Sequence, residues 1–346
     1  MTRLEKLRES LDERLLVTNL TNIRYLTGFD SSNAALLVDP AGPAQLYTDF
    51  RYIETAEQIE EVEAHQAKRN LLGDLAQRLK GRLAFEADVL PYAYVELLGK
   101  GGLDLVPSSG KVEAVRAVKD EDEIASLKRA ATAADRAFEA LTAEPWVGHS
   151  EKELAWKLRQ LLNAHGVVRP AFDAIVASGV NGSHPHGDPT DSIITEHTLV
   201  TVDWGAIADG YCSDCTRTMS TGNGLPKELK RAYDVCLEAQ LAAVEGIKPG
   251  MTGHEADEVA RRIITKAGFG EEFGHGLGHG VGVDVHEDPR LAPESANVLE
   301  PGNIVTIEPG IYLQGVGGVR IEDLAVVREN GVELLTSFPK ELTPVG

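Results

Sequence analysis

Cysteine, long apolar runs and basic residues are all scarce in this sequence. Its 346 residues include only three cysteines, and so small and odd a number does not indicate a disulfide framework. No run approaches the ~18 apolar residues that a membrane span requires, so we expect no membrane partner. Residues 1–6 show no apolar stretch behind a basic head. We therefore expect no secretory signal and a reducing, cytoplasmic setting.

Basic residues are outnumbered, with 34 Lys and Arg against 54 Asp and Glu, which leaves a formal net charge of −20. Phosphate backbones are bound by clustered Lys and Arg, so the sequence argues against a nucleic-acid partner. The simplest use of the acidic excess is solubility. Hydrophobic residues make up 42% of the chain, which is ordinary for a globular protein with a sizeable core. The length predicts two domains at ~100–200 residues each.

The first 110 residues alternate between helical and strand-like patterns, which indicates an α/β domain. Four leucines, at positions 4, 7, 11 and 15, repeat at a helical spacing. Apolar and β-branched runs bounded by Gly and Pro predict strands at 34–38, 45–48 and 82–86. Helical patterns cover residues 51–60 and 71–80.

A charged segment, residues 111–123, predicts a linker that runs into a long helix. On that helix Ile124, Leu127 and Ala131 share one face. Ser150 and Glu153 form the pattern of a capping box for a second helix at about 151–165. Further helices are expected at 226–246 and 253–267, and the sequence has no low-complexity segment and no solenoid-like repeat.

Four acidic residues end or adjoin strand-like segments in the last third of the chain: Asp203, Asp214, Glu308 and Glu322. Taken singly, each is more simply a solvated strand end, because an unpartnered acid is unfavourable to bury. The acids nevertheless come in two pairs, the first around Ala208-Asp209-Gly210 and the second around a glycine-rich loop. Each pair would face across an antiparallel hairpin. Two such hairpins would build a pseudosymmetric cage for metal ions.

Histidines cluster near the second pair of acids. His275, His279 and His286 lie within or just after the glycine-rich segment 274–282. Alternate glycines disfavour a helix and let the backbone pass close to a ligand. The segment does not complete G-x-G-x-x-G, and no H-E-x-x-H motif occurs in the chain. The cluster therefore favours metal binding or acid–base chemistry of another kind.

Four carboxylates and one imidazole, that of His279, suit a pair of divalent cations of the Mn, Co or Zn type better than Mg. Paired cations of this kind activate water for hydrolysis at neutral pH. Arg320, two residues before Glu322, is either half of a weak surface ion pair or a cation that orients a metal-bridging carboxylate. His186 lies in a Pro-His-Gly loop that is either a substrate contact or a plain surface turn. Cys212 and Cys215 lack a second pair to complete a zinc site, so we interpret them as small strand residues.

Taken together, these segments resemble the pita-bread metallopeptidases, and among them the Xaa-Pro dipeptidase (prolidase) and aminopeptidase P group. Residues 22–29 are similar to the creatinase-type N-terminal domain of that family. The resemblance implies an α/β fold with a creatinase-like domain at 1–110, a linker at 111–123 and a pita-bread catalytic domain at 124–346. The matching C-terminal segments are Val202-Asp203-Trp204-Gly205-Ala206, Asp214-Cys215-Thr216-Arg217-Thr218, residues 275–282, Asp284-Val285-His286-Glu287, residues 307–312 and Val319-Arg320-Ile321-Glu322-Asp323.

The resemblance also implies a role for each matching residue. Asp203 would hold one metal, and His279 and Glu308 would hold the other. Asp214 and Glu322 would bridge the two ions. Glu308 would in addition carry a proton to the leaving nitrogen. The remaining residues would hold substrate or support the cage: His186, His275, His286 and Arg320.

The implied activity is hydrolysis of the peptide bond before proline in Xaa-Pro dipeptides. Two alternatives stay open: an aminopeptidase P that takes longer peptides, and a non-enzymatic binding protein on the same fold. The complete ligand set argues against the second. A dipeptidase needs a cation or a blocking loop for the free carboxylate, and Arg51 is a candidate, contributed by the partner subunit of an expected homodimer. The simpler interpretation of Arg51 is a surface residue at a helix start.

Overall fold

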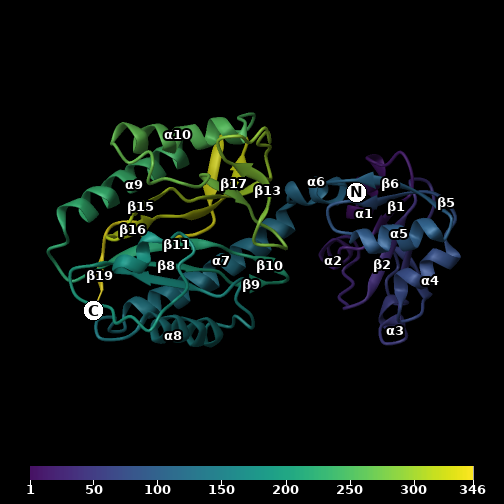
Figure 1. Cartoon of the computed structure of the whole chain (residues 1–346), viewed down its shortest axis with the longest axis horizontal. Coiled ribbons are helices and arrows are strands. Elements are labelled where there is room, and N and C mark those ends of the chain that lie inside the picture. The colour runs from purple at the N-terminus through teal and green to yellow at the C-terminus, as the bar shows by residue number, and fades with distance from the viewer. Residues whose placement is uncertain (346) are drawn as a thin grey trace. The chain divides into compact units, whose positions relative to one another are not determined.

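The structure is a computed structural model that describes residues 1–345 of the chain (Figure 1). Contacts within it divide the chain into two compact units, Met1–Arg116 and a second unit from Ala117 onward. Among residues 1–345, none of the helices is both long and apolar enough to cross a membrane.

The N-terminal unit is a six-stranded mixed sheet in the order β4-β3-β2-β1-β5-β6. β2 pairs antiparallel with both β1 and β3, and the remaining pairs are parallel. The strands are β1 Leu15–Val17, β2 Ala34–Val38, β3 Ala44–Thr48, β4 Val62–Gln66, β5 Gly81–Glu86 and β6 Leu103–Ser108. The helices are α1 Arg3–Glu9, α2 Leu20–Thr27, α3 Ile53–Ala56, α4 Leu71–Arg78, α5 Tyr92–Lys100 and α6 Lys111–Ala117. The strands predicted in this region are confirmed.

Two helical predictions in this unit are wrong in extent. α1 ends at Glu9, and Leu15 instead begins β1, whose three residues are all buried between β2 and β5. Pairing on both edges stabilises this short apolar segment more than continuation of the helix would. The helix predicted over 51–60 shrinks to α3, whose N-cap residue Tyr52 makes no side-chain cap.

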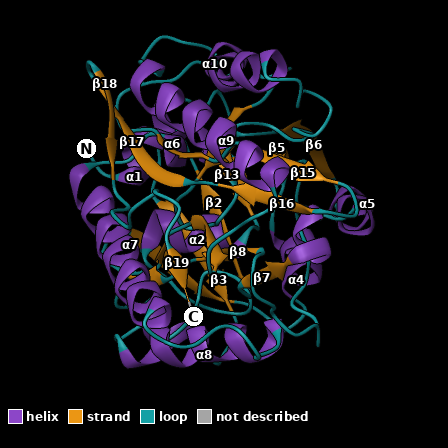
Figure 2. Cartoon of the chain, turned by 90° about the vertical axis from the view of Figure 1, so that its left-hand side faces the viewer, coloured by secondary structure: helices purple, strands orange, loops and turns teal. Residues whose placement is uncertain are grey.

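The C-terminal unit sandwiches its strands between two pairs of helices. α9 (Lys227–Gly246) and α10 (Gly253–Lys266) lie on one side, and α7 (Glu121–Thr142) and α8 (Glu151–Ala164) on the other (Figures 1 and 2). The capping box predicted for α8 is present, since Ser150 accepts from the Glu153 amide and Glu153 accepts in return. One sheet has the order β19-β11-β8-β7 and another β13-β12-β14-β17-β18. The strands are β7 Ile175–Ser178, β8 Leu199–Trp204, β9 Ile207–Ala208, β10 Tyr211–Cys212, β11 Cys215–Thr221, β12 Gly278–Gly280, β13 Glu287–Leu291, β14 Ile304–Ile307, β15 Gly310–Leu313, β16 Gly317–Arg320, β17 Asp323–Arg328, β18 Gly331–Leu334 and β19 Pro344–Val345.

Each pair of helices buries a hydrophobic core against one sheet, and the first half of α7 also packs against β14 and β17. Side chains of α9 and α10 pack with those of β14, β15 and β17. Side chains of α7 and α8 pack with those of β8 and β11. Near the centre of this second core the ring of Phe138 stacks on Trp204, with centroids 3.9 Å apart. The two cores hold two sheets in place, and the acids of interest lie where those sheets end.

Two antiparallel ladders carry these acids. β8 pairs with β11, and β14 pairs with β17. The chain that leaves each ladder forms a second short hairpin before it returns, β9–β10 in one half and β15–β16 in the other. The antiparallel pairing predicted for both pairs of acids is confirmed. The difference is that each connection is a further hairpin rather than a simple turn.

We expect Phe138→Ala to lower the free energy of unfolding of the C-terminal unit by about 3–5 kcal/mol, because it leaves a cavity beside Trp204 and Trp146. The measurement is chemical denaturation followed by tryptophan fluorescence. All three tryptophans of the chain, Trp146, Trp156 and Trp204, lie in this unit, so the signal reports on it alone. Val168→Ala is the control, since that side chain is 92% exposed. An equal effect of the two substitutions would contradict the assignment of the core.

Candidate metal centre

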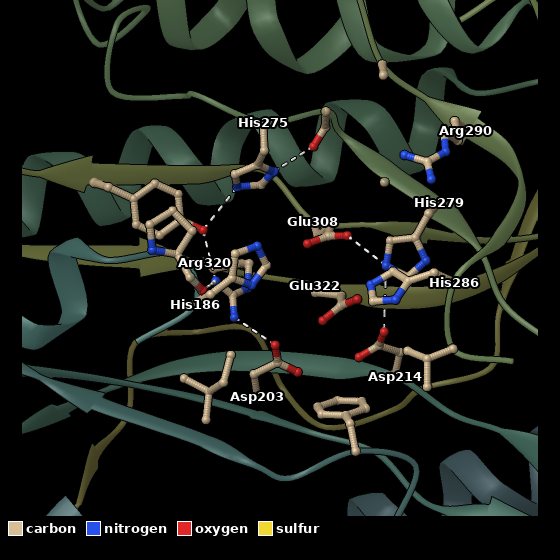
Figure 3. Close-up of a pocket in the computed structure, with 18 residues that line it drawn as sticks. His186, Asp203, Asp214, His275, His279, His286, Arg290, Glu308, Arg320 and Glu322 are labelled. Atoms are coloured by element: carbon tan, nitrogen blue, oxygen red, sulfur yellow. Dashed lines mark hydrogen bonds and ion pairs between the residues drawn. The ribbon is translucent and has the colours of Figure 1, made fainter. Parts of the chain in front are cut away.

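A cavity of about 490 Å³ opens in the C-terminal unit where the two ladders end. It contains every residue that the sequence singled out in this unit (Figure 3), namely His186, Asp203, Asp214, His275, His279, His286, Glu308, Arg320 and Glu322. In Figure 3 the four carboxylates gather at the centre, with Arg320 on one side and His279 on the other.

Strand geometry places the four acids. Asp203 is the penultimate residue of β8, and Asp214 immediately precedes β11, where Thr216 is the register partner of Asp203. Glu308 immediately follows β14, and Glu322 immediately precedes β17. The ends of the two ladders therefore project their carboxylates toward one another. Each acid sits on or next to a hydrogen-bonded strand, which restricts its position.

Three of the carboxylates crowd together. One oxygen from each of Asp203, Asp214 and Glu322 lies within 4.8 Å of the others. Burial, followed by the charge of Glu322, raises the pKa of Asp214 well above its usual value. Burial and the charge of Glu308 do the same to the pKa of Glu322. A divalent cation would relieve this repulsion, since it favours the ionised form of each group.

His279 faces this group through its Nε2 atom, 3.3 Å from Glu308 Oε1 and 3.7 Å from Asp214 Oδ2. Its Nδ1 lies 3.0 Å from the carbonyl oxygen of Gly280, which can only accept, so Nδ1 carries a proton. Burial tends to lower the pKa of His279, but the hydrogen bond from Nε2 to Glu308 raises it. Burial tends to raise the pKa of Glu308, but His279 lowers it to about 2. A metal ion bound here would take the place of the Nε2 proton, in the tautomer that metal-ligating histidines use.

Asp203 supplies the test of whether these residues fit a metal ion. Its Oδ2 accepts from Arg320 Nη2 at 2.7 Å. Its Oδ1 is buried and has no hydrogen-bond partner among residues 1–345. A buried carboxylate oxygen without a partner needs an explanation, and binding of a metal ion is one. The oxygen donors and the imidazole together fit a divalent cation of the transition-metal type.

Arg320 ties the acids to one another. It is only 4% exposed, which excludes the surface ion pair considered from the sequence. Besides Asp203 it donates from Nε to Thr216 Oγ1 at 3.0 Å, and Thr216 in turn donates to Glu322 Oε2 at 2.8 Å. β16 ends at Arg320, so Arg320 and Glu322 do not share a strand face although they are two residues apart. The reason is that the amide of Glu322 donates to the Thr216 carbonyl of another strand at 3.0 Å.

Tyr312 is a cavity residue to which sequence reasoning assigned no role. Its hydroxyl accepts from Arg320 Nη1 at 2.9 Å and lies 3.0 Å from His275 Nε2. His275 Nδ1 is 2.7 Å from the Gly276 carbonyl and must donate to it, so His275 Nε2 accepts from Tyr312. Burial lowers the pKa of His275, which favours this neutral form. The sequence signal was weak: Tyr312 follows Glu308 by four residues, on β15.

Arg290 is a second cavity residue missed from the sequence. It lies on β13, is exposed, and has no hydrogen bond or ion pair through its side chain among residues 1–345. His286 is exposed nearby, with its ring 4.4 Å from that of His279. His186 is an exposed residue of the loop that follows the 3₁₀ helix Gly179–Ser183. A free guanidinium in a cavity rich in acids indicates a site for an anionic group.

Arg51 does not line this cavity, all of whose lining residues belong to the C-terminal unit. In the N-terminal unit its guanidinium donates to Asp49 at 2.9 and 2.7 Å. Its contribution to substrate binding therefore stays a prediction. Cys212 and Cys215 are buried on β10 and β11, as expected for small strand residues.

A buried ion network supports the strand that carries Glu322. Arg217 donates from Nη1 to the carbonyl oxygens of Thr216, at 3.0 Å, and of Glu322. From Nη2 it donates to Asp323 Oδ1 at 2.8 Å. Asp323 also contacts Lys340. Glu322 thus belongs to the candidate metal site, whereas the next residue, Asp323, belongs to the adjoining ion network.

Comparison with known proteins gives consistent matches over both units. Residues 125–329 match the model of metallopeptidase family M24, and residues 3–118 match that of the creatinase/prolidase N-terminal domain. The Xaa-Pro dipeptidase of Pyrococcus furiosus is 37% identical over 98% of this chain and 99% of its own length. The structure of a Xaa-Pro dipeptidase from Bacillus anthracis superposes with a TM-score of 0.95 at 40% identity, covering 99% of each chain. An X-Pro aminopeptidase from Thermotoga maritima has a TM-score of 0.86 at 33% identity, covering 96% of this chain and 97% of its own.

These matches bear directly on the fold. The M24 model alone spans more than half of the 346 residues, and the relatives are covered almost end to end. The predicted fold class, a mixed α/β chain with a creatinase-like N-terminal domain and a pita-bread C-terminal domain, is confirmed. The cavity at the ladder ends lies within the matched catalytic region. The chain is a member of metallopeptidase family M24.

Proposed function

We propose that this protein is a metal-dependent Xaa-Pro dipeptidase, which hydrolyses the peptide bond before proline. The observation that carries the proposal is the convergence of four carboxylates and one imidazole at the ends of two ladders. Relatives named Xaa-Pro dipeptidase, at 36 and 37% identity over nearly the whole chain, support it.

The proposed ligands follow the resemblance. Asp203 would hold one cation, His279 and Glu308 would hold the other, and Asp214 and Glu322 would contribute to both. We propose two divalent ions per chain, manganese or cobalt in preference to zinc, because oxygen donors outnumber the single imidazole. When bound, such ions supply a nucleophile from water and polarise the scissile carbonyl.

The charges of the cavity orient a dipeptide. Figure 3 shows Asp203 at the lower left of the group of acids and Arg290 at the upper right. The free ammonium of the substrate would lie toward Asp203, and its carboxylate toward Arg290. Phe172 and Ile175 line the cavity as well and offer an apolar contact for the first side chain. Arg290 is thus a second candidate, besides Arg51, for the cation that binds the substrate carboxylate.

Because the substrate contains proline, the leaving nitrogen must receive a proton from the enzyme or from water. The X–Pro nitrogen carries no hydrogen, so a peptidase cannot recognise it through an N–H contact and must protonate it as the C–N bond breaks. Glu308 Oε1 is engaged by Thr306 and His279, whereas its second oxygen has no partner among residues 1–345. That oxygen would take a proton from the attacking water and pass it to the proline nitrogen. His275 and His286 would hold the substrate during this transfer, and His186 would contact it from the loop.

The remaining features of the proposal concern the whole chain. We propose a catalytic domain at 124–346 joined through 111–123 to the creatinase-like domain at 1–110. A homodimer in the cytoplasm is the expected setting, and Arg51 would then act from the partner subunit.

The alternative is an aminopeptidase P that prefers longer peptides. Initial rates on Ala-Pro and on Ala-Pro-Ala, with Mn²⁺ supplied, distinguish the two. A larger kcat/KM for Ala-Pro would support the dipeptidase. A larger value for the tripeptide would move the proposal to the aminopeptidase, and no cleavage of either with any divalent cation would refute both.

We expect Asp214→Asn and Glu322→Gln to lower kcat more than ~100-fold, because even partners outside the ligand shell are worth 10–100-fold at metal sites. Bound metal, measured by elemental analysis, should fall toward one ion per chain. Asp209→Asn is the matched control, since Asp209 is exposed and lies in the turn between β9 and β10. Full activity in either ligand variant would contradict the proposed bridging roles.

We expect Arg290→Met to raise the KM for Ala-Pro about 10- to 100-fold, the range that a charged hydrogen bond of ~1.5–3 kcal/mol represents. The KM for Ala-Pro amide, which lacks the carboxylate, should change little. Arg262→Met on the exposed face of α10 controls for loss of a surface charge. An equal rise for both substrates would mean that Arg290 shapes the cavity without reading the carboxylate.

Divalent cations should stabilise the folded C-terminal unit, because they bind the assembled acids and not the unfolded chain. At 100 times the dissociation constant the gain is about 2.7 kcal/mol. The measurement is chemical unfolding of the chelator-treated protein with and without Mn²⁺, followed by tryptophan fluorescence. Glu322→Gln should reduce the gain. Identical unfolding curves with and without Mn²⁺, Co²⁺ and Zn²⁺ would contradict a metal site.

A further inference from the structure

Glu151, the first residue of α8, is a buried glutamate that takes no part in the metal centre or in the proposed chemistry. Its exposed fraction is 0%. α8 does not need it as a cap, because Ser150 and Glu153 already form the capping box. A buried acid is unfavourable unless donors surround it, so the groups that donate to Glu151 indicate its role.

The hydrogen bonds of the Glu151 side chain among residues 1–345 all come from one segment, residues 178–190, which we call the His186 loop. Oε1 accepts from the amide and from the hydroxyl of Ser178, at 2.7 and 2.8 Å. Oε2 accepts from Asn181 Nδ2 at 2.8 Å, and from the amide and the hydroxyl of Thr190 at 2.9 and 2.6 Å. One carboxylate therefore joins the two ends of the His186 loop.

Two further contacts restrain the loop between its ends. Besides Glu151, Asn181 Nδ2 donates to the carbonyl oxygen of Asp188 at 3.1 Å, which draws the two halves of the loop together. On the side of the catalytic cavity, Arg320 Nη1 donates to the carbonyl oxygen of Pro185 at 2.9 Å. The main chain is thus held at both ends of the loop and at the residue that precedes His186.

His186 depends on this loop for its position. It is exposed and lines the catalytic cavity. Its imidazole makes no hydrogen bond or ion pair with any other group among residues 1–345. The rings of His275 and His279, in contrast, are each fixed by a bond from Nδ1 to a main-chain carbonyl. The main chain of the His186 loop therefore decides where the ring of His186 lies.

We propose that Glu151 is a positioning residue, which holds His186 at the substrate through its hydrogen bonds to both ends of the His186 loop. This inference rests on the proposed function, in which His186 contacts the substrate. Glu151 does not line the catalytic cavity, so it acts through the loop. A loop that is already ordered lowers the entropic penalty of substrate binding. Release of the loop would misplace His186, and a displacement of about 1 Å can lower a rate about 100-fold.

The test is a double-mutant cycle of Glu151→Gln and His186→Ala. It measures kcat/KM of the Mn²⁺-loaded proteins for Ala-Pro, or for Ala-Pro-Ala if the wild type cleaves only the tripeptide. The amide of glutamine has the shape of the carboxylate, but its NH₂ group faces other donors in either orientation, so one end of the loop is released. Glu151→Gln should lower kcat/KM about 10- to 100-fold when His186 is present, and less than about twofold in His186→Ala. Bound metal, measured by elemental analysis, should stay at the wild-type level.

Glu153→Gln is the matched control. Glu153 is an exposed glutamate in the same turn of α8 that accepts from Ser150 and makes no contact with the His186 loop. This variant weakens the cap of the helix and should keep the wild-type kcat/KM. If Glu151→Gln does not fold, Thr190→Val replaces it in the cycle, because it removes one donor to Glu151 and keeps the shape of the side chain.

The outcomes separate this inference from the proposed function. Equal losses of kcat/KM with and without His186 would mean that Glu151 has a structural role only, and would overturn the inference while the peptidase stands. Loss of bound metal in Glu151→Gln, or wild-type activity in His186→Ala, would overturn it as well. Failure of the wild type to cleave either peptide with any divalent cation would refute the proposed function, and the inference with it.

Discussion

Four buried or partly buried carboxylates that line one cavity are the constraint on which this structure depends. Burial disfavours each charge, and the charges also repel one another. Asp203 is compensated by Arg320, and Glu308 by His279. Asp214 and Glu322 are left with pKa values well above the usual ones. Among residues 1–345 no positive charge fully compensates these two acids, and divalent cations would supply it.

The C-terminal unit, in which two pairs of helices enclose the strands, keeps these mutually repelling acids together. The ladders β8–β11 and β14–β17 are each covered by a pair of helices, so the strands that carry the acids are fixed by packing as well as by hydrogen bonds. Ligands on regular elements are positioned more accurately than ligands on loops. The residues at the cavity rim, His186 and Arg290 among them, are exposed instead, and there substrate preference can vary without disturbing the cage.

Two arginine side chains next to the acids, those of Arg320 and Arg217, complete the arrangement. Arg320 spans Asp203, Thr216 and Tyr312, and through Thr216 it reaches Glu322. Arg217 holds the main chain next to Glu322. Partners of this kind orient ligands, which is why their loss typically costs about 10- to 100-fold in metal affinity or activity. The catalytic geometry is thus determined by residues that need not touch substrate.

The sequence by itself determined three strands of the first domain (β2, β3 and β5), the capped helix α8 and the four acids beside His279. Each of these shows in local patterns, such as the Ser150–Glu153 box or an acid closing an apolar strand. Tertiary structure alone decided that α1 stops at Glu9 and that Tyr312 and Arg290 line the cavity. Residues far apart in the chain make these contacts, as with Arg320 and Asp203, which lie 117 positions apart. Periodicity encodes which face of an element is apolar, whereas the meeting of two ladder ends depends on how both helix layers pack.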